Sequence, residues 1–327
     1  MKKALLVIIL VLLSIACTEN TYESWKPISV NLVSVPTLTI RKLQSFNDSL
    51  FVVTNYSATR GGGFWKVLAV ASADYLAAAT AFRTSIGVAA WITAVSGGTA
   101  GPLTGVAVLT VTGAIAAGAS YGAASGIYSV PIPFDRLSIN DIFGTSAAYE
   151  YLYDYESYYE VHDLSTFFLN VNEMGEVLGD IHNDIVSELL ECKYSYTRDV
   201  GPINSERIEF VQATIERAGM MLEDIENAYV IGVSNFESLF QKGDYIDYID
   251  IVHKDGLMSD EVTDILMLLN EALTYGTIDC SSANNTIDFY IGTIEKSIDL
   301  GEEDRTILIL TLNIAKKSIS LWNSILN

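Results

Sequence analysis

One stretch of the chain limits its fold more than any other feature: residues 84–134 contain no charged side chain and no histidine. The apolar surface of such a run has to be removed from water, so it is buried in the protein, in a bilayer or against a partner. Residues 64–96, which lead into it, are rich in alanine and carry only Lys66, Asp74 and Arg83 as charges. This composition predicts a long helix.

Glycines and a proline divide this region into a predicted helical hairpin. Residues 97–102 read Gly-Gly-Thr-Ala-Gly-Pro, a strong turn signal, and Pro102 suits the first position of a second helix ending near Gly126. In this second arm Gly118, Gly122 and Gly126 recur every four residues. Residues four apart share a helix face, so these glycines predict close packing of another backbone.

Two interpretations of the hairpin are open. Residues 103–126 are 24 uncharged residues, enough to cross a hydrocarbon core of roughly 30 Å, which favours membrane insertion. However, 17 of the 24 are Ala, Gly, Ser or Thr, and only 13 uncharged residues lie between Arg83 and the turn. Thr and Val in residues 106–112 also suit a strand. The small residues and the short first arm favour a tightly packed hairpin that is buried inside the protein or against a partner.

The start of the chain has the pattern of an export signal. Two lysines precede an apolar run of ten residues, Ala4–Leu13, which is short for a transmembrane helix. Residues 13–17, LSIAC, resemble the lipobox of bacterial lipoproteins, although Ser14 stands where that family usually has Leu. The resemblance implies cleavage before Cys17, acylation of Cys17 and attachment to the cell envelope. Because residue 18 is not Asp, it implies the outer membrane. An ordinary secretory signal and an uncleaved anchor are the alternatives.

The rest of the chain divides at changes of composition. Between Pro27 and Pro36 the residues alternate loosely, and Leu50–Thr54 is a candidate strand, so we expect an extended linker after the tether. Val130-Pro131-Ile132-Pro133 breaks helices and predicts a domain boundary. The predicted segments are a signal peptide at 1–16, a tether and extended linker at 17–59, the Gly/Ala-rich hydrophobic hairpin at 60–133, and an acidic helical domain at 134–327.

The charges are distributed unevenly along the chain. Residues 1–133 hold 8 Lys/Arg and 4 Asp/Glu, whereas residues 134–327 hold 11 and 36. So large a negative excess repels phosphate backbones and anionic headgroups, so we expect no nucleic acid partner. A protein partner with a basic surface suits it better.

From about Leu164 onward the apolar residues recur at helical spacing. In residues 169–189 they form one helix face, opposite a face of acidic residues. Further helices are predicted over Ser205–Gln241, Ser259–Tyr275, Asn284–Leu300 and Glu302–Ile325, with Ser205 and Ser259 as N-caps. Five helices with short connections predict an antiparallel bundle. The fold class is therefore mainly α: a Gly/Ala-rich helical hairpin plus an acidic antiparallel bundle, after an extended N-terminal linker.

Tyrosines are concentrated at the start of the acidic half. Residues 149–159 hold six of them among acidic residues. Such a strip can serve recognition, but amphipathic tyrosines at a domain margin more often pack, so we favour packing.

No arrangement of residues points to catalysis, a metal or a cofactor. The three histidines, His162, His182 and His253, lie in no metal-binding motif. Glu176, Asp180, His182 and Asp184 form the most tempting cluster. On an ideal helix, however, His182 points about 200° away from Asp180, so these side chains converge poorly on one ion. Phosphate-binding and nucleophile motifs are absent, and we predict a protein that is not an enzyme.

The cysteines allow one disulfide. No CxxC pair or Cys/His cluster occurs, which argues against zinc. If Cys17 is acylated, Cys192 and Cys280 remain in an oxidising compartment, where they either pair or stay as two separate buried thiols.

Two segments resemble poorly characterised bacterial lipoproteins that combine a Gly/Ala-rich segment with a helical C-terminal region. They are Asn172 with GEVLGDIHN at 175–183, and EEDRTILILTLNIAKKSISLW at 302–322. The resemblance covers residues 60–327 and implies no known activity. The hairpin is also similar to the hydrophobic region of small bacteriocin-like peptides. We therefore expect a non-enzymatic envelope lipoprotein that binds a partner through its acidic domain. The alternative is a membrane-active, toxin-like protein that inserts residues 64–128.

Overall fold

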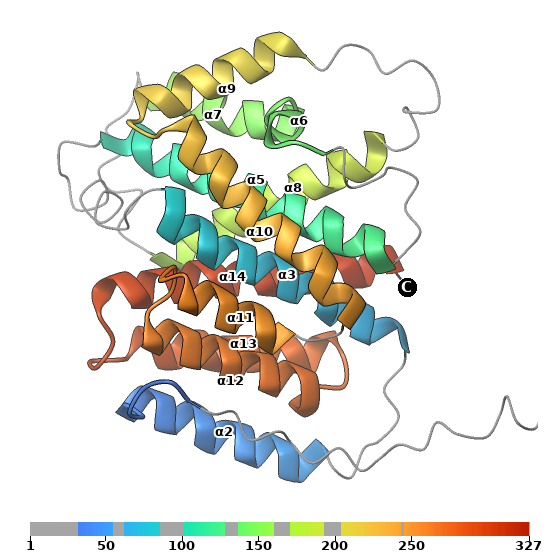
Figure 1. Cartoon of the computed structure of the whole chain (residues 1–327), viewed down its shortest axis with the longest axis vertical. Coiled ribbons are helices and arrows are strands. Elements are labelled where there is room, and N and C mark those ends of the chain that lie inside the picture. The colour runs from blue at the N-terminus through green and yellow to red at the C-terminus, as the bar shows by residue number, and fades with distance from the viewer. Residues whose placement is uncertain are drawn as a thin grey trace, which may run out of the picture. The chain divides into compact units, whose positions relative to one another are not determined.

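The computed structural model describes residues 32–54, 62–85, 101–127, 137–159, 171–192, 204–242 and 245–326. In these ranges the chain forms twelve helices and no strand (Figure 1). From Leu32 onward these helices belong to one packed unit. Their bounds are α2 Leu38–Thr54, α3 Gly62–Ser85, α5 Gly101–Ile127, α6 Ile139–Phe143, α7 Ser146–Tyr159, α8 Val171–Cys192, α9 Ser205–Arg217, α10 Leu222–Lys242, α11 Tyr245–Lys254, α12 Asp260–Gly276, α13 Cys280–Glu295 and α14 Glu302–Leu326.

Two apolar helices, α3 and α5, form the centre of the unit. Helix α3 packs against α5, α10 and α14, and α5 packs against α3, α8 and α10. Every residue from Val70 to Phe82 in α3 and from Thr104 to Tyr121 in α5 is buried. The helix predicted from Pro102 to Gly126 is thus confirmed, and the alternative of a strand at 106–112 is wrong. The helix predicted over 64–96 is confirmed as far as Ser85, and its remaining residues lie outside the described ranges.

Small residues let the helices around this centre approach closely. Helix α10 crosses α3 and α5, and a Cβ added at its Gly232 would lie 3.5 Å from Ala77 Cβ and 3.4 Å from Ile115 Cγ2. Helix α8 packs against α14. A Cβ added at Gly179 would lie 2.5 Å from Lys317 Cγ, closer than real contacts allow. Glycine at position 179 therefore sets how closely α8 and α14 pack, whereas a Cβ at position 232 would meet its neighbours at ordinary van der Waals distances.

The segment predicted as an extended linker contains a helix instead. Helix α2 covers the candidate strand Leu50–Thr54, although this strand is rich in β-branched residues. Buried Ile40, Leu43, Asn47 and Phe51 recur every three or four residues, which is the period of a helix packed on one face.

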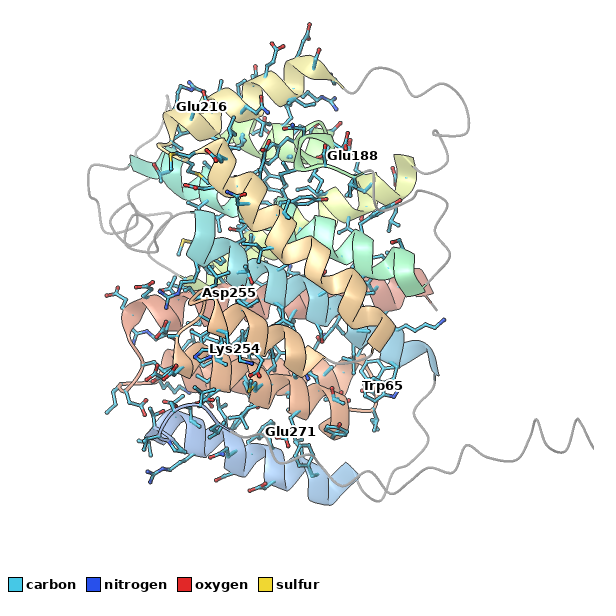
Figure 2. The ribbon with its side chains drawn as sticks, in the orientation of Figure 1. Trp65, Glu188, Glu216, Lys254, Asp255 and Glu271 are labelled. Carbon is cyan, nitrogen blue, oxygen red and sulfur yellow. The ribbon has the colours of Figure 1, made fainter. Side chains whose placement is uncertain are left out.

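The packing of α2 on α12 and α13 explains why the strand prediction was wrong. Asn47 Nδ2 donates to Leu268 O at 2.9 Å and to Glu271 Oε2 at 3.3 Å, and Tyr290 OH donates to Asn47 Oδ1 at 2.8 Å. Burial on α12 raises the pKa of Glu271, which is labelled in Figure 2. Tertiary contacts thus outweigh the local strand propensity of Val52, Val53 and Thr54.

Helix ends differ from the sequence predictions at several places. The single helix predicted over Ser205–Gln241 is wrong, because the chain breaks into α9 and α10 at Gly219, whose φ of 83° suits a glycine. Asn204, and not Ser205, caps α9, since its side chain accepts from Arg207 N at 3.3 Å. Ser259 is confirmed as the N-cap of α12. Helices α6, α7 and α11 were missed, so the described part of the acidic half has more helices than the five predicted.

Segments from both predicted halves share this core. The predicted boundary at residues 131–133 lies outside the described residues. On its two sides, α3 and α5 pack directly against α8, α10 and α14. The apolar helices α3 and α5 therefore lie between helices of the acidic half.

Candidate functional site

A groove of about 970 Å³ opens between α5, α7 and α8. The apolar residues from α5 and Ile181 of α8 are buried and form its floor, whereas most of the acidic residues are exposed and form its rim. The lining residues are Val106, Leu109, Ser146, Ala147, Glu150, Tyr151, Asp154, Val177, Ile181, Asp184, Ser187, Glu188 and Glu191. We call this site the acidic groove.

Helical spacing places the carboxylates of the acidic groove together. Glu150 and Asp154 lie one turn apart on α7, and Asp184 and Glu188 lie one turn apart on α8. Five of the thirteen lining residues are acidic and none is basic. Like charges at a spacing of four residues destabilise a helix by about 0.2–0.5 kcal/mol per pair. A cation held between them would relieve this repulsion.

One of these carboxylates is used to hold the groove together. Glu188 accepts hydrogen bonds from the backbone amides of Ser146 at 2.7 Å and Ala147 at 2.9 Å. These amides begin α7, where free N–H groups and the helix dipole favour a negative charge. Arg207 Nη1 also donates to Ser146 Oγ at 2.6 Å. Glu188, which is labelled in Figure 2, therefore fixes α7 against α8, and both of its carboxylate oxygens are engaged in these hydrogen bonds.

Tyr151 joins the two sides of the acidic groove. Its hydroxyl donates to Asp184 Oδ2 at 3.0 Å. Burial, and then the negative charges of Asp184 and Asp180, raise the pKa of Tyr151 above its usual value. The phenol thus stays protonated at neutral pH and acts as a donor, not as a base.

The lining residues suit binding better than catalysis. Among them no His, Cys or Lys stands beside a hydroxyl that could act as a nucleophile. An apolar floor with a carboxylate rim matches a ligand that has an apolar part and positive charges. The apolar part would lie on the floor, and the positive charges would lie beside the carboxylates.

A second cluster contains the residue types of a catalytic triad. Asp74 Oδ2 accepts from Ser120 Oγ at 2.9 Å and also from Ser318 Oγ. His182 Nε2 lies 3.3 Å from the same oxygen. Trp322 Nε1 donates to Ser120 Oγ at 2.9 Å. We call these five residues the buried polar cluster; they come from α3, α5, α8 and α14.

The buried polar cluster lacks what a triad needs. In a triad the serine donates to the histidine, whereas here both serines donate to the aspartate. Asp74 and His182 are 0% exposed, so a substrate has no access to them. The cluster instead ties four helices together at the centre of the protein.

The acidic residues grouped with His182 in the sequence point away from His182 in the structure. Glu176 and Asp180 each lie 2.9 Å from Lys317 Nζ, and Asp184 faces Tyr151. His182 points the other way, into the core. His253 Nε2 is paired with Asp260 Oδ1 at 2.7 Å, and His162 lies outside the described residues.

Of the other residues singled out in the sequence, the structure describes only some. Cys280 is a half-buried free thiol, and burial, followed by the charge of Asp279, raises its pKa. Its pairing with Cys192, whose side chain is not described, stays a prediction, and Cys17 lies outside the described residues. A Cβ added at Gly118 would lie 2.5 Å from Tyr229 Cε2. Close packing along the row with Gly122 and Gly126 stays a prediction.

The described part of the tyrosine strip packs against α9. Tyr149 and Tyr153 stack with ring centroids 5.3 Å apart, and both rings contact Phe210. Arg207 lies over the Tyr149 ring at 5.9 Å. Tyr151, between them, faces the acidic groove instead.

One described helix has the length and composition to cross a membrane. This segment, Leu103–Ser125, lies within α5 and has a mean hydropathy of 1.6. In this structure 94% of its most apolar window is buried inside the protein.

The described part of the chain is thus an all-helical protein with an acidic surface groove. Comparison with protein-family models, with curated proteins and with solved structures finds no match for the chain.

Sequence reasoning missed the groove as a site, although it identified several of its members. Asp184 was noted as a member of the discounted cluster with Glu176, Asp180 and His182, and Tyr151 only as part of the tyrosine strip. The signal that could have found the groove is the acidic pair spaced four residues apart on each of two helices.

Proposed function

We propose that this protein is a lipid-anchored, non-enzymatic component of the cell envelope that binds a basic partner in the acidic groove. In this proposal the acylated Cys17 is joined by its tether to a Gly/Ala-rich helical hairpin, which lies in an acidic antiparallel bundle. The outer membrane is the proposed location.

The acidic groove is the observation that carries the binding role. Glu150, Asp154 and Glu191 lie exposed around buried Val106 and Leu109. A partner helix with an apolar stripe and flanking Lys or Arg side chains would fill the floor and meet the rim. Charge pairs at an exposed rim contribute mainly specificity and association rate, while the buried apolar floor supplies affinity.

Calorimetric titration tests this role. The full acylated chain in nonionic detergent is titrated with an amphipathic peptide that carries lysines beside a leucine stripe. In the variant Glu150→Gln/Asp154→Asn/Glu191→Gln we expect binding several-fold weaker at low salt, because the faster association that three rim charges give is lost without a change of shape.

A matched control separates the site from net charge. The variant Glu216→Gln/Glu223→Gln/Glu226→Gln removes the same number of exposed charges from α9 and α10, which lie outside the groove; Glu216 is labelled in Figure 2. It should bind as the wild type does. Equal weakening in both variants would mean that the peptide follows overall charge, and the groove would lose its role.

Membrane insertion is the second candidate function, and the length of Leu103–Ser125 favours it. Insertion requires α3 and α5 to leave the helices that bury them. Cysteines at positions 77 and 232 would form a disulfide that locks α10 to α3, because a Cβ at Gly232 lies 3.5 Å from Ala77 Cβ, a distance at which disulfides form.

The lock gives a direct test of insertion. The variant Ala77→Cys/Gly232→Cys, with Cys192→Ser and Cys280→Ser, is added to dye-filled liposomes. Leakage that occurs only after reduction would support insertion. Equal leakage from the oxidised and reduced proteins, or none from either, would argue against it.

A further inference from the structure

Three large apolar side chains stand exposed where the described chain begins. Val35 is 85% exposed, Leu38 at the start of α2 is 71% exposed, and Ile298 between α13 and α14 is 92% exposed. We call these residues the N-terminal apolar tip. Exposed apolar side chains that stand together on one surface mark contact with a partner or a membrane.

Hydrogen bonds hold the two parts of the tip together. Thr39 N donates to Asp299 Oδ2 at 3.0 Å, and Thr39 Oγ1 donates to Ser297 Oγ at 2.9 Å. Leu38 and Ile298 are the immediate chain neighbours of these residues. The start of α2 is therefore fastened to the turn that carries Ile298.

Both sides of this contact are themselves well fixed. Ser34 N and Oγ donate to Asp264 Oδ2 at 2.9 Å and 2.6 Å, which attaches the segment before α2 to α12. On the other side, Leu300 N donates to Ser297 Oγ at 3.1 Å and Arg305 Nη1 donates to Ser297 O at 3.2 Å. The apolar side chains thus lie on segments that are hydrogen-bonded to the rest of the fold.

The position of the tip in the chain indicates what covers it. Only 14 residues separate Cys17 from Leu32, where the described chain begins. Fifteen peptide steps reach at most about 50 Å. A lipid on Cys17 therefore holds the tip within about 50 Å of the bilayer, and the effective concentration set by this tether favours even a weak contact.

The charged side chains around the tip are of both signs. Arg41 and Lys42 are exposed on the first turns of α2, and Lys296 is exposed two residues before Ile298. Glu295, Asp299 and Glu302 are exposed beside them, so the tip suits a zwitterionic bilayer surface. Long basic side chains beside apolar ones are typical of proteins that rest in the headgroup region, because the charge stays in water while the apolar part is buried.

We propose that the N-terminal apolar tip docks on the phospholipid bilayer that holds the lipid anchor, and thereby fixes how the helical domain is oriented on the membrane. The inference rests on the proposed anchor at Cys17. Val35, Leu38 and Ile298 enter the interface, and Arg41, Lys42 and Lys296 lie at headgroup level. Helix α9 is held away from the lipid, because α9 and α2 lie at opposite ends of the packed unit (Figure 1).

Depth-dependent fluorescence tests the docking. The full acylated chain carrying Cys192→Ser and Cys280→Ser is reconstituted on zwitterionic phosphatidylcholine vesicles. An environment-sensitive dye is attached to Ile298→Cys or, as the control, to Met221→Cys, which precedes α10 and is 64% exposed. We expect blue-shifted emission and several-fold quenching by spin-labelled lipid for the dye at residue 298 and neither effect for the dye at residue 221.

A second variant checks that the apolar side chains cause the contact. A dye on Ser45→Cys, exposed one turn after Arg41 on α2, should also be quenched when the tip is unchanged. The change Val35→Ser/Leu38→Ser/Ile298→Ser should then remove most of this quenching, while circular dichroism stays unchanged because these residues are exposed. Vesicle flotation is measured in parallel. If the protein floats with the vesicles but the dyes at residues 298 and 45 both emit as they do in water, the docking is overturned and the anchor is not. Protein that does not float would overturn the anchor and the docking together.

Discussion

Asp74 shows how one polar residue can organise an apolar core. It is 0% exposed on α3, yet its carboxylate meets the hydroxyls of Ser120 and Ser318 and the ring of His182. A buried carboxylate is tolerated only when such partners replace water. Since these partners come from three other helices, the residue favours one arrangement of α3, α5, α8 and α14.

We predict that Asp74→Ala lowers the free energy of unfolding by on the order of 3 kcal/mol, because the hydroxyls of Ser120 and Ser318 lose their acceptor in the core. Urea unfolding followed by circular dichroism measures the change. The exposed Asp48→Ala on α2 serves as control and should change stability by less than about 0.5 kcal/mol. Similar values for both variants would refute a special role for the buried polar cluster.

Asp299 makes a different, pH-dependent contribution. Partial burial acts to raise the pKa of its carboxyl, but hydrogen bonds from Thr39 and Ser297 outweigh this and hold the pKa below its ordinary value. A carboxyl whose folded pKa lies below its unfolded pKa stabilises the fold above the unfolded value. This stabilisation is lost as the pH falls through the folded pKa.

The wild type should therefore exceed Asp299→Asn in stability by a constant amount from neutral pH down to about pH 4.5, and the gap should narrow only below about pH 4. Urea unfolding at a series of pH values measures the gap. A gap that already closes between about pH 6 and pH 7 would show that another group controls it.

At the scale of helices, the local sequence pattern predicted which segments are helical better than it predicted where each helix begins and ends. Alanine content and turn residues were enough for α3 and α5, and apolar periodicity was enough for α8, α12 and α14. In α2 the β-branched Val52 and Val53 suggested a strand, and only packing on α12 and α13 decides for a helix. The break at Gly219 was missed because an isolated glycine in a helical pattern does not by itself end a helix.

Glycine positions on these helices differ sharply in their surroundings, which gives a matched pair of substitutions. A Cβ at Gly118 in α5 would lie 2.5 Å from Tyr229 Cε2 and 2.9 Å from Ile142 Cδ1, whereas nothing lies within 4 Å of one at Gly292 in α13. We expect Gly118→Ala to lower stability by about 1–3 kcal/mol through overpacking. Gly292→Ala should raise stability by about 0.5–1 kcal/mol through helix propensity.

Thermal unfolding followed by circular dichroism measures both variants. Melting temperatures that move in opposite directions would agree with the packing of α5 described above. A Gly118→Ala protein as stable as the wild type would contradict it.

At the scale of the whole molecule, the uneven charge along the sequence becomes a difference between inside and outside. The uncharged residues of α3 and α5 lie in the centre, and helices of the acidic half surround them. The sequence alone could predict that the uncharged stretch is buried. It could not place α7 beside α8, so the acidic groove became recognisable only when Glu150 and Asp184 were brought to one surface.

In the proposed function, the lipid anchor at Cys17 would determine which surfaces of this molecule face a membrane and which face a partner, so it is the proposal to test first. The most direct measurement is intact and N-terminal peptide mass spectrometry of the protein purified from membranes. We expect a mature chain that begins at Cys17 and carries the added mass of a diacylglyceryl group. An intact unmodified start at Met1, or a free thiol at Cys17, would contradict the account.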